Sequence, residues 1–541
     1  MSSPRHSLSR RRFLQISAAT LGALAIRGLP IYAAAAAHFT HGVASGDPLQ
    51  DRVILWTRVL PGDGQAETLD VQWQIAVDPQ FEQIVAAGDT QTGPARDFTV
   101  KVDAAGLTPG TSYFYRFTAT GIHSATGRTR TLPAAGAAQA RLAVVSCSNY
   151  PQGYFNAYRE IAARECDAVL HLGDYIYEYA DGGYANADML NKGRHVQPEH
   201  EIVSLDDYRM RYGLYRSDAD LQAIHQAHPF ICVWDDHEIT NNTFQTGAQN
   251  HNDGEGEFDD RRRAAIQAFY EWLPIREQGN VEDGIIYRSF DIGDLATLIM
   301  LDTRLIARDE QLTHDMNIDT LRRGLADSTR SMLGATQQQF LANELRRSAS
   351  AGIPWQVIGQ QVIMGRKEIP LVADVEFAED IRPDIASSRY GMLRERGQMG
   401  LPFNLDAWDG YPADRERVLD LFRQHANNAV VLSGDTHSSW AFDLHDDTGE
   451  AIAVEFGTPS ITSPGFENFM PLPENELVAA FMRNSPEMRY MRGLGRGWME
   501  LDLTRERIAT RFLYVSTVME QDYQVEETNE MLTVAGEHVI R

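Results

Sequence analysis

The chain has 541 residues, of which 43% are hydrophobic, so it is long enough to bury one large core and a second, smaller one. Its formal charge of −26 at pH 7 disfavours binding to nucleic acid or anionic lipid and favours divalent cations. We therefore expect no specific nucleic-acid binding. Solubility of a secreted protein is an alternative reason for the acidic excess.

Residues 1–37 are interpreted as a twin-arginine signal peptide and not as part of the fold. The paired arginines of "SRRRFLQ" precede the apolar "ISAATLGALAI", and "IYAAAAAH" offers an A-x-A cleavage site near residues 35–37. The alternative interpretation of this segment is an ordinary amphipathic N-terminus. The signal predicts the twin-arginine export machinery as a partner and a periplasmic or secreted location. No later stretch has the roughly 20 apolar residues of a transmembrane segment.

Residues 38–132 are predicted to form an all-β domain. The segments "VQWQIAV" (71–77) and "FTVKV" (98–102) alternate apolar and polar residues, which is the period of half-buried strands. In "GLTPGTSYFYRF", the spacing up to Tyr113 is typical of the tyrosine corner of a fibronectin type III sandwich. The stretch contains no catalytic cluster, and an Ala-, Gly- and Pro-rich linker (133–140) follows it.

From residue 141 the pattern changes to short apolar runs that alternate with amphipathic helices such as "DRERVLDLFRQH" (414–425), which indicates an α/β layered domain. Five of these runs end in chemically active residues, namely Cys147, Asp174, Asp235–Glu238, Asp302–Arg304 and Asp435–His437. Because ligand sites of such sheets lie beyond the carboxyl ends of the strands, we expect an active site there. For any single Asp, a turn or N-cap role is the alternative.

The expected cluster combines a thiol, a phenol and an imidazole with carboxylates: Cys147, Asp174, Tyr177, Asp236, Asp435 and His437. Carboxylates that lie close together without a cation repel one another or take up protons. Thiolate, phenolate and imidazole suit iron, whereas carboxylates suit Ca, Mg or Mn. A bridging Asp could join two ions, as two-metal hydrolytic sites require. The other two cysteines, Cys166 and Cys232, are interpreted as core residues.

The motifs "GDYIY", "DDHE" and "GDTH", in this order, are similar to the metallophosphoesterase pattern GD-x-x, GNHE, GH-x-H. The tyrosine of "GDYIY" resembles the ferric-iron ligand of purple acid phosphatases. Together with "FTHGVASGDPLQDRVILWTRV" (39–59), "SCSNYPQG", "WDDHEITNN" and "SGDTH", the chain resembles the alkaline phosphatase D (PhoD) family over roughly residues 38–515. The resemblance implies a four-layer α-β-β-α metallophosphoesterase-like catalytic domain (141–515) behind the fibronectin type III-like domain, and a C-terminal tail or lid (516–541).

The resemblance also implies a hydrolase of phosphate mono- and diesters that uses Fe³⁺ and Ca²⁺, with Mn or Mg as alternatives at the second site, for phosphate scavenging. The implied roles are metal bridging for Asp174, iron binding for Cys147, Tyr177 and His437, and the calcium side for Asp236 and Asp435. We expect in-line attack on phosphorus by a metal-bound hydroxide or oxygen.

Two further residues are predicted to act on the substrate. His237 could donate a proton to the leaving alkoxide, with a role as hydrogen-bond partner of Asp174 or Asp236 as its alternative. Arg304 could clamp the phosphate because its fork matches phosphate oxygens, with a structural salt bridge as its alternative.

One ligand of the broader superfamily is not evident. Its middle V-x-x-H motif has no counterpart, because the strand "PWQVIGQQV" ends in Gln360 and Gln361. Asn241 and Asn242, which follow "DDHE", are secondary candidates for this ligand. Closing a loop is the alternative role for each of these amides.

Other functions compete with this interpretation. A cysteine-nucleophile phosphatase would need an Arg six residues beyond Cys147, where the chain has Gly153. A phospholipase D-like phosphodiesterase, a non-catalytic surface binding protein and an iron oxidase are the remaining alternatives. The carboxylate-rich second site favours hydrolysis over oxidation.

Overall fold

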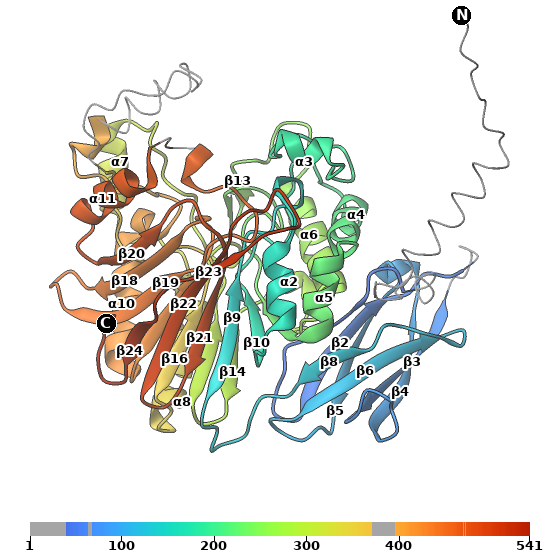
Figure 1. Cartoon of the computed structure of the whole chain (residues 1–541). Coiled ribbons are helices and arrows are strands. Elements are labelled where there is room, and N and C mark those ends of the chain that lie inside the picture. The colour runs from blue at the N-terminus through green and yellow to red at the C-terminus, as the bar shows by residue number, and fades with distance from the viewer. Residues whose placement is uncertain (1–38, 63–67, 371–394, 469, 471) are drawn as a thin grey trace, which may run out of the picture.

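The structure is a computed structural model that describes residues 39–62, 68–370, 395–468, 470 and 472–541. The predicted signal peptide lies outside the described residues. Figure 1 shows a smaller β part, drawn in blue, beside a larger part in which helices flank two sheets. The mixed α/β architecture with an N-terminal β domain is the predicted fold class.

The N-terminal part is a sandwich of two sheets around its own core. One sheet contains β1 (Val43–Gly46), β2 (Arg52–Arg58) and β5 (Thr99–Ala105), and the other contains β4 (Ile84–Thr92), β3 (Leu69–Ala76), β6 (Ser112–Ala119), β7 (Ile122–His123) and β8 (Gly127–Arg130). Alternate residues such as Leu55 and Ile75 meet in the core. The Tyr113 hydroxyl accepts a hydrogen bond from the Thr108 N–H at 2.8 Å, so the predicted tyrosine corner is present.

Two large sheets form the centre of the larger part. The first runs in the order β23 (Val525–Glu527), β22 (Arg507–Val515), β21 (Arg496–Leu503), β9 (Ala140–Val145), β10 (Ala168–His171), β11 (Pro229–Cys232), β1, β2 and β5, with β24 (Met531–Val534) on β22. The second runs in the order β14 (Arg288–Ile292), β15 (Ala296–Met300), β16 (Trp355–Gly359), β17 (Ala429–Ser433), β19 (Ala451–Gly457), β18 (Ser439–His445) and β20 (Met488–Arg492).

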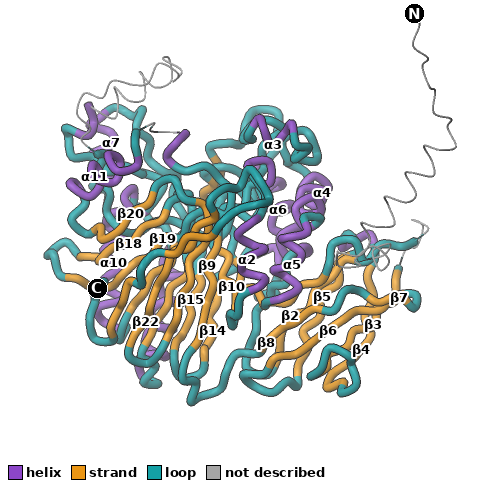
Figure 2. Tube along the Cα trace, in the orientation of Figure 1, coloured by secondary structure: helices purple, strands orange, loops and turns teal. Residues whose placement is uncertain are grey.

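The layers follow from strands that bury both faces. In β15, Leu298 and Met300 join the core shared with the first sheet, whereas Ile299 joins the core beneath the helices of the second sheet. The helices α2 (Asn156–Ala163), α4 (Leu205–Arg216), α5 (Ala219–Ala227) and α6 (Phe258–Trp272) flank the first sheet, and α8 (Gly334–Ser350) and α10 (Pro412–His425) flank the second. The helices α3 (Ala187–Asn191), α7 (Ile318–Leu325) and α11 (Glu474–Asn484) lie near the upper end in Figure 2.

Both ends of the described chain are built into the first sheet. β1 of the sandwich pairs in parallel with β11, so the sandwich and the larger part share one sheet. At the other end, β23 and β24 pair with β22, which places part of residues 516–541 at the sheet edge. Within the described residues, no helix has both the length and the hydrophobicity needed to cross a bilayer.

Candidate metal centre

The residues that follow β9, β10, β11 and β17 meet in one place. Ligand atoms lie within 4.8 Å of one another in three overlapping groups: Cys147, Asp174 and His437; Asp174, Asp236 and His237; and Asp235, Asp236 and Asp435. Asp174 belongs to the first two groups, and Asp236 to the last two. These four strands therefore deliver the side chains that follow them to one continuous cluster.

A tyrosine completes the first group. The Tyr177 hydroxyl donates to Asp174 Oδ2 at 2.9 Å and lies 3.2 Å from His437 Nε2. His437 Nδ1 lies 2.8 Å from the Pro464 carbonyl oxygen. Because a carbonyl only accepts, Nδ1 carries the hydrogen and Nε2 presents its lone pair to the cluster. Thiol, phenol, imidazole and carboxylate thus surround one point.

The backbone at this point is unusual. Cys147, Asp174, Asp435 and His437 have φ angles of 60°, 55°, 62° and 59°, all in the left-handed region that non-glycine residues rarely adopt. Such conformations cost about 1–3 kcal/mol each and persist where the surrounding structure enforces them. Four of the six predicted metal ligands therefore occupy strained positions, which is typical of functional sites.

The cluster fits a metal ion. Oδ1 of Asp174 and Oδ2 of Asp235 are buried, and neither has a hydrogen-bond partner among the described residues. Burial, together with the Asp174 carboxylate, raises the pKa of the Cys147 thiol well above its ordinary value. Burial and neighbouring carboxylates likewise raise the pKa of Asp435 to about 7, against the effect of Arg304. A cation would offset the desolvation and repulsion that cause these shifts.

Asp236 is the exception among these carboxylates. Burial favours its neutral form, but Arg304 and His237 outweigh burial and hold the pKa of Asp236 below its usual range. Its Oδ2 also accepts the Asn242 N–H at 2.7 Å. This carboxylate is therefore ionised and fixed in position within the cluster.

His237 is oriented by a buried glutamate. Its Nδ1 lies 2.6 Å from Glu178 Oε2, its Nε2 lies 4.0 Å from Asp236 Oδ1, and its ring lies 4.3 Å from the ring of Tyr177. Although burial lowers the pKa of His237, Glu178 and Asp236 raise it well above the ordinary value. The imidazole therefore carries a proton beside the cluster.

Arg304 is fully buried and surrounded by carboxylates. Its three guanidinium nitrogens contact Asp235 at 2.5 Å, Asp406 at 2.7 Å and Asp435 at 2.8 Å. These contacts match the salt-bridge alternative, because each nitrogen already has an anionic partner. The role of Arg304 as a phosphate clamp stays a prediction.

The uncertain amides all have local partners. Gln361 Oε1 accepts from the Thr303 N–H at 2.9 Å, and Gln360 Oε1 accepts from the Trp408 indole N–H at 2.7 Å. Asn241 and Asn242 both donate to the side-chain oxygen of Gln249. These contacts are the loop-closing roles that were weighed as alternatives to metal binding.

Three acidic residues support the site: Glu178 and Asp406, which sequence reasoning missed, and Glu238, to which it assigned no role. Glu178 orients His237, Asp406 pairs with Arg304, and Glu238 accepts the backbone N–H groups of Asp174, Tyr175 and Asp235. Burial and the Asp174 charge raise the pKa of Glu238 to about 8. Glu178 directly follows the "GDYIY" motif and Glu238 is the last residue of "DDHE", so their place in the sequence was a usable signal of a role in the site. Asp406 lies about 100 residues from Arg304 in the chain, and no sequence signal pointed to it.

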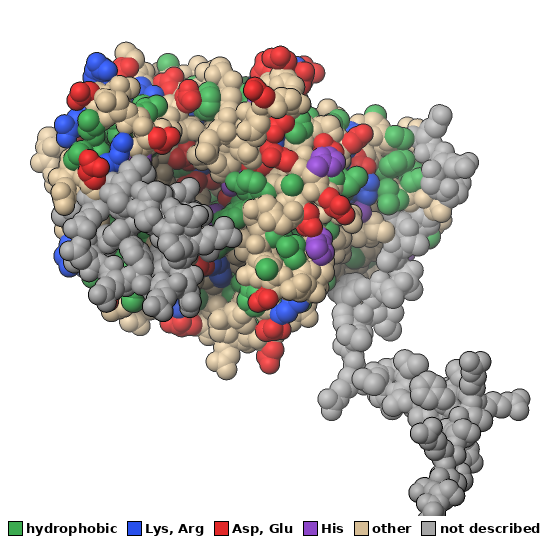
Figure 3. Space-filling model, turned by 90° about the horizontal axis from the view of Figure 1, so that it is seen from above, with side chains coloured by type: hydrophobic (Ala, Val, Ile, Leu, Met, Phe, Trp, Pro, Cys, Tyr) green, Lys and Arg blue, Asp and Glu red, His purple; other side chains and the backbone are tan. Residues whose placement is uncertain are grey.

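Two pockets are lined in part by residues of the segment 462–467. The smaller has a volume of about 410 Å³ and is lined by Asn242, Asp435, His437, Lys367, Phe403, Asn404, Asp406, Thr436, Trp440, Gly465, Phe466 and Met470. Seen from above, the surface is hollowed near its centre, with acidic side chains around the hollow (Figure 3).

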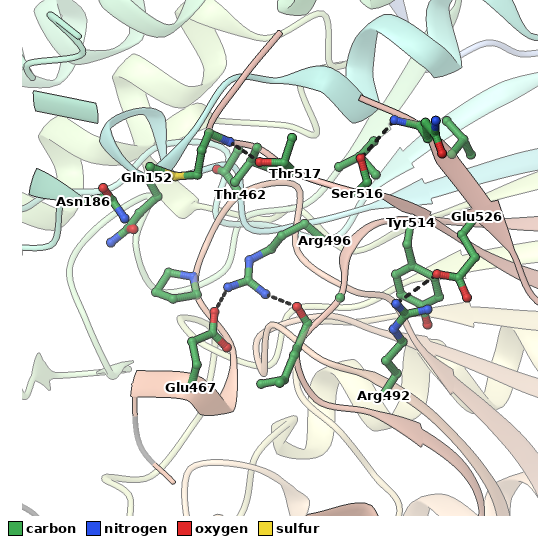
Figure 4. A pocket seen from close by; sticks show the side chains of 18 of the residues that line it. Gln152, Asn186, Thr462, Glu467, Arg492, Arg496, Tyr514, Ser516, Thr517 and Glu526 are labelled. Atoms are coloured by element: carbon green, nitrogen blue, oxygen red, sulfur yellow. Dashed lines mark hydrogen bonds and ion pairs between the residues drawn. The ribbon is translucent and has the colours of Figure 1, made fainter. Parts of the chain in front are cut away.

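The larger pocket, of about 690 Å³, is polar (Figure 4). Its two arginines are already paired: Arg496 contacts Glu467, and Arg492 contacts Glu526 at 3.1 Å. Only the smaller pocket is lined by residues of the candidate metal centre.

Comparisons with known proteins agree with this geometry. The family model of the PhoD-like phosphatase matches residues 142–512, and that of the PhoD-like phosphatase, N-terminal domain, matches residues 25–133. Alkaline phosphatase D of Bacillus subtilis (strain 168) is 37% identical over 491 residues, which cover 85% of this chain and 77% of that protein.

Solved structures agree as well. A structure of PhoD matches with a TM-score of 0.79 and 33% identity over 95% of this chain and 93% of that chain. Purple acid phosphatase PPD1 from yellow lupin (Lupinus luteus) seeds matches with a TM-score of 0.50 and 14% identity over 87% and 71% of the two chains. At 14% identity, the second likeness shows the fold alone.

Proposed function

Because the chain belongs to the PhoD-like phosphatase family, and is thus a phosphoric ester hydrolase, we propose that it is an exported enzyme for phosphate mono- and diesters with a mixed iron and calcium site. The observation that carries this proposal is that Asp174 is shared by a group with Cys147 and His437 and a group with Asp236 and His237, and that Asp236 in turn joins Asp435. Phosphate scavenging is the physiological role that suits an exported enzyme of this kind.

Each group suits one class of metal. Cys147, Tyr177 and His437 offer the soft and borderline ligands that iron takes, whereas Asp236 and Asp435 offer the oxygens that calcium takes. Asp174, which belongs to two of the three groups, would be a ligand of both metals. The bound metals would supply an activated water and neutralise charge on the phosphoryl oxygens.

The chain's own residues orient these ligands. Ser463 donates a hydrogen bond to the Tyr177 hydroxyl oxygen at 2.6 Å, and the Pro464 carbonyl fixes the tautomer of His437. Glu238 accepts from the backbone on both sides of the site and so holds the loops after β10 and β11 together. Ligand orientation by such partners contributes to metal affinity.

His237 is proposed as the proton donor to the leaving alkoxide. It lies beside Asp236, and Glu178 holds its other nitrogen, so that Nε2 is directed to the cluster. A positioned acid of this kind typically contributes 10²–10⁴-fold to the rate.

The proposal is tested by metal analysis with kinetics. The protein is purified without chelators, and its metals, visible spectrum and hydrolysis of p-nitrophenyl phosphate and bis-p-nitrophenyl phosphate are measured for wild type and Cys147→Ala. Cys166→Ala is the matched control, because Cys166 is a half-buried free cysteine outside the cluster.

We expect iron near one per chain together with calcium, a violet tyrosinate-to-iron absorption, and loss of iron and activity in Cys147→Ala alone. A colourless, metal-free protein that still hydrolyses either ester would refute the proposed metal site. The ratio of the two rates sorts monoesters from diesters.

Export by the twin-arginine route is tested separately. Replacing Arg10 and Arg11 by Lys should retain the protein in the cytoplasm, as measured by cell fractionation. Unchanged export of this variant would reject the route and leave the hydrolase proposal intact.

A further inference from the structure

The smaller pocket has a lining of two chemical kinds. Asn242, Asp435 and His437 are polar lining residues, and the last two belong to the candidate metal centre. Phe403, Trp440, Phe466 and Met470 are apolar lining residues, and the rings of Phe403 and Trp440 both neighbour Phe466, so that they form one apolar wall. A ligand that fills this pocket therefore has a polar and an apolar part.

The apolar wall is fixed by packing. The ring of Phe403 lies 5.8 Å from Phe466 and 5.0 Å, edge to face, from Phe481. Phe466 lies 6.0 Å from the fully buried Trp440, whose indole N–H donates to Thr436. Phe403 is the half-buried member of this group, so its ring is both held in place and accessible.

The charges of the pocket argue against a second anionic group. Among the described lining residues, Lys367 is the cation, and its buried ammonium donates to the Gly365 carbonyl at 3.1 Å and lies 3.8 Å from Asp409. The nearby acids Asp406 and Asp435 add negative charge. An uncharged organic group is thus better accommodated than a second phosphate.

The size of the pocket is also limiting. A cavity of about 150 Å³ is enough to hold a benzene molecule. A pocket of about 410 Å³ thus has room for a phosphoryl group together with one aromatic ring or a short alkyl chain.

We propose that Phe403, Trp440 and Phe466 form a subsite for the organic group of the substrate, and that this subsite selects phosphate esters of aryl or short alkyl alcohols over esters of polyols. The inference rests on the proposed function, because it places the phosphoryl group at Asp435 and His437. Phe403 is the residue whose accessible ring contributes most to the selection.

The test compares two phosphate monoesters. The kcat/KM values for phenyl phosphate and glycerol 2-phosphate are measured for wild type, Phe403→Leu, Phe403→Ala and a control. The control is Phe340→Ala, because Phe340 is also half-buried at the margin of the same core but does not line the pocket.

We expect Phe403→Ala to lower the ratio of the two kcat/KM values by roughly 10-fold, Phe403→Leu to lower it less, and Phe340→Ala to leave it unchanged. The difference in intrinsic reactivity between the two esters cancels when their kcat/KM ratio is compared between variants, because each variant acts on the same two substrates. An unchanged ratio in both Phe403 variants would overturn the subsite.

A binding measurement separates this proposal from the proposed function. Calorimetric affinities for phenylphosphonate and methylphosphonate, which are not hydrolysed, are measured on the same proteins. If wild type cleaves neither ester, the proposed function fails. The subsite then stands only if wild type prefers phenylphosphonate and Phe403→Ala loses about 10-fold of that preference. Equal affinities in wild type would reject the subsite.

Discussion

The role of Arg304 can be decided by one substitution. In Arg304→Met, the aliphatic volume is retained while the contacts to Asp235, Asp406 and Asp435 are lost. Because Asp235 is fully buried, its carboxylate would remain without its cationic partner. We therefore expect a loss of stability that exceeds the effect on substrate binding.

The expected loss is large for a single residue. Removing one partner of a buried ion pair typically costs about 3–5 kcal/mol. For a chain with about 500 described residues, the unfolding entropy is roughly 1 kcal/mol/K, at about 2.1 cal/mol/K per residue. The melting temperature should therefore fall by roughly 3–5 °C. Added metal should recover part of this loss, because cations bind the freed carboxylates in the folded state only.

The assay measures melting temperature with and without chelator, together with KM for glycerol 2-phosphate. Arg304→Lys is the companion variant, because it keeps the charge but not the fork that joins three carboxylates. It should fall between wild type and Arg304→Met. An unchanged melting temperature with a KM raised 10-fold or more would refute the salt-bridge reasoning and support the phosphate clamp.

Three further predictions concern the framework of the site. Gly173→Ala should abolish metal binding or folding, measured by metal content and circular dichroism, because φ is +104° and the new Cβ would lie 2.3 Å from Asp235 Cβ. Burial lowers the pKa of His171 to about 3, so the unfolded state binds an extra proton below about pH 6.5. Stability should thus fall from pH 6.5 towards 3, and His171→Gln should make the fall of the melting temperature over this range less steep. A profile that is equally steep in the variant would contradict this cause. Tyr113→Phe should cost roughly 1 kcal/mol in denaturant titrations through loss of the hydrogen bond to Thr108, and no change would mean that the tyrosine corner is dispensable.

Much of the fold was predictable because its strands follow simple patterns. The apolar runs before Cys147, Asp174 and Asp435 correspond to β9, β10 and β17. The active residues that follow these runs predicted one common site, but not that β17 belongs to a different sheet from β9 and β10. The pairing of β1 with β11 was not predictable, because it joins segments about 180 residues apart and no local pattern marks a strand's partner.

Site residues were predictable where the end of a strand determines their position. They were not predictable where contacts between distant segments determine their orientation. Cys147 and His437 follow strands directly, whereas the orientation of His237 depends on Glu178, which lies in another loop. Charge is a poor guide to burial for a similar reason. The charged sequence of α6 is typical of a solvated face, yet this helix buries Arg261 against Glu201 and Glu255. A buried arginine of this kind depends on partners that no sequence period reveals.

The shared sheet also constrains the order in which the protein can assemble. β1 leaves the ribosome about 180 residues before β11, the strand with which it pairs. At 5–20 residues per second, its edge stays open for roughly 10–40 s of synthesis. The N-terminal sandwich therefore cannot finish as an independent unit, and a nascent chain of this length exposes an unpaired strand edge to other chains. Synthesis of β11 and its pairing with β1 would close that edge.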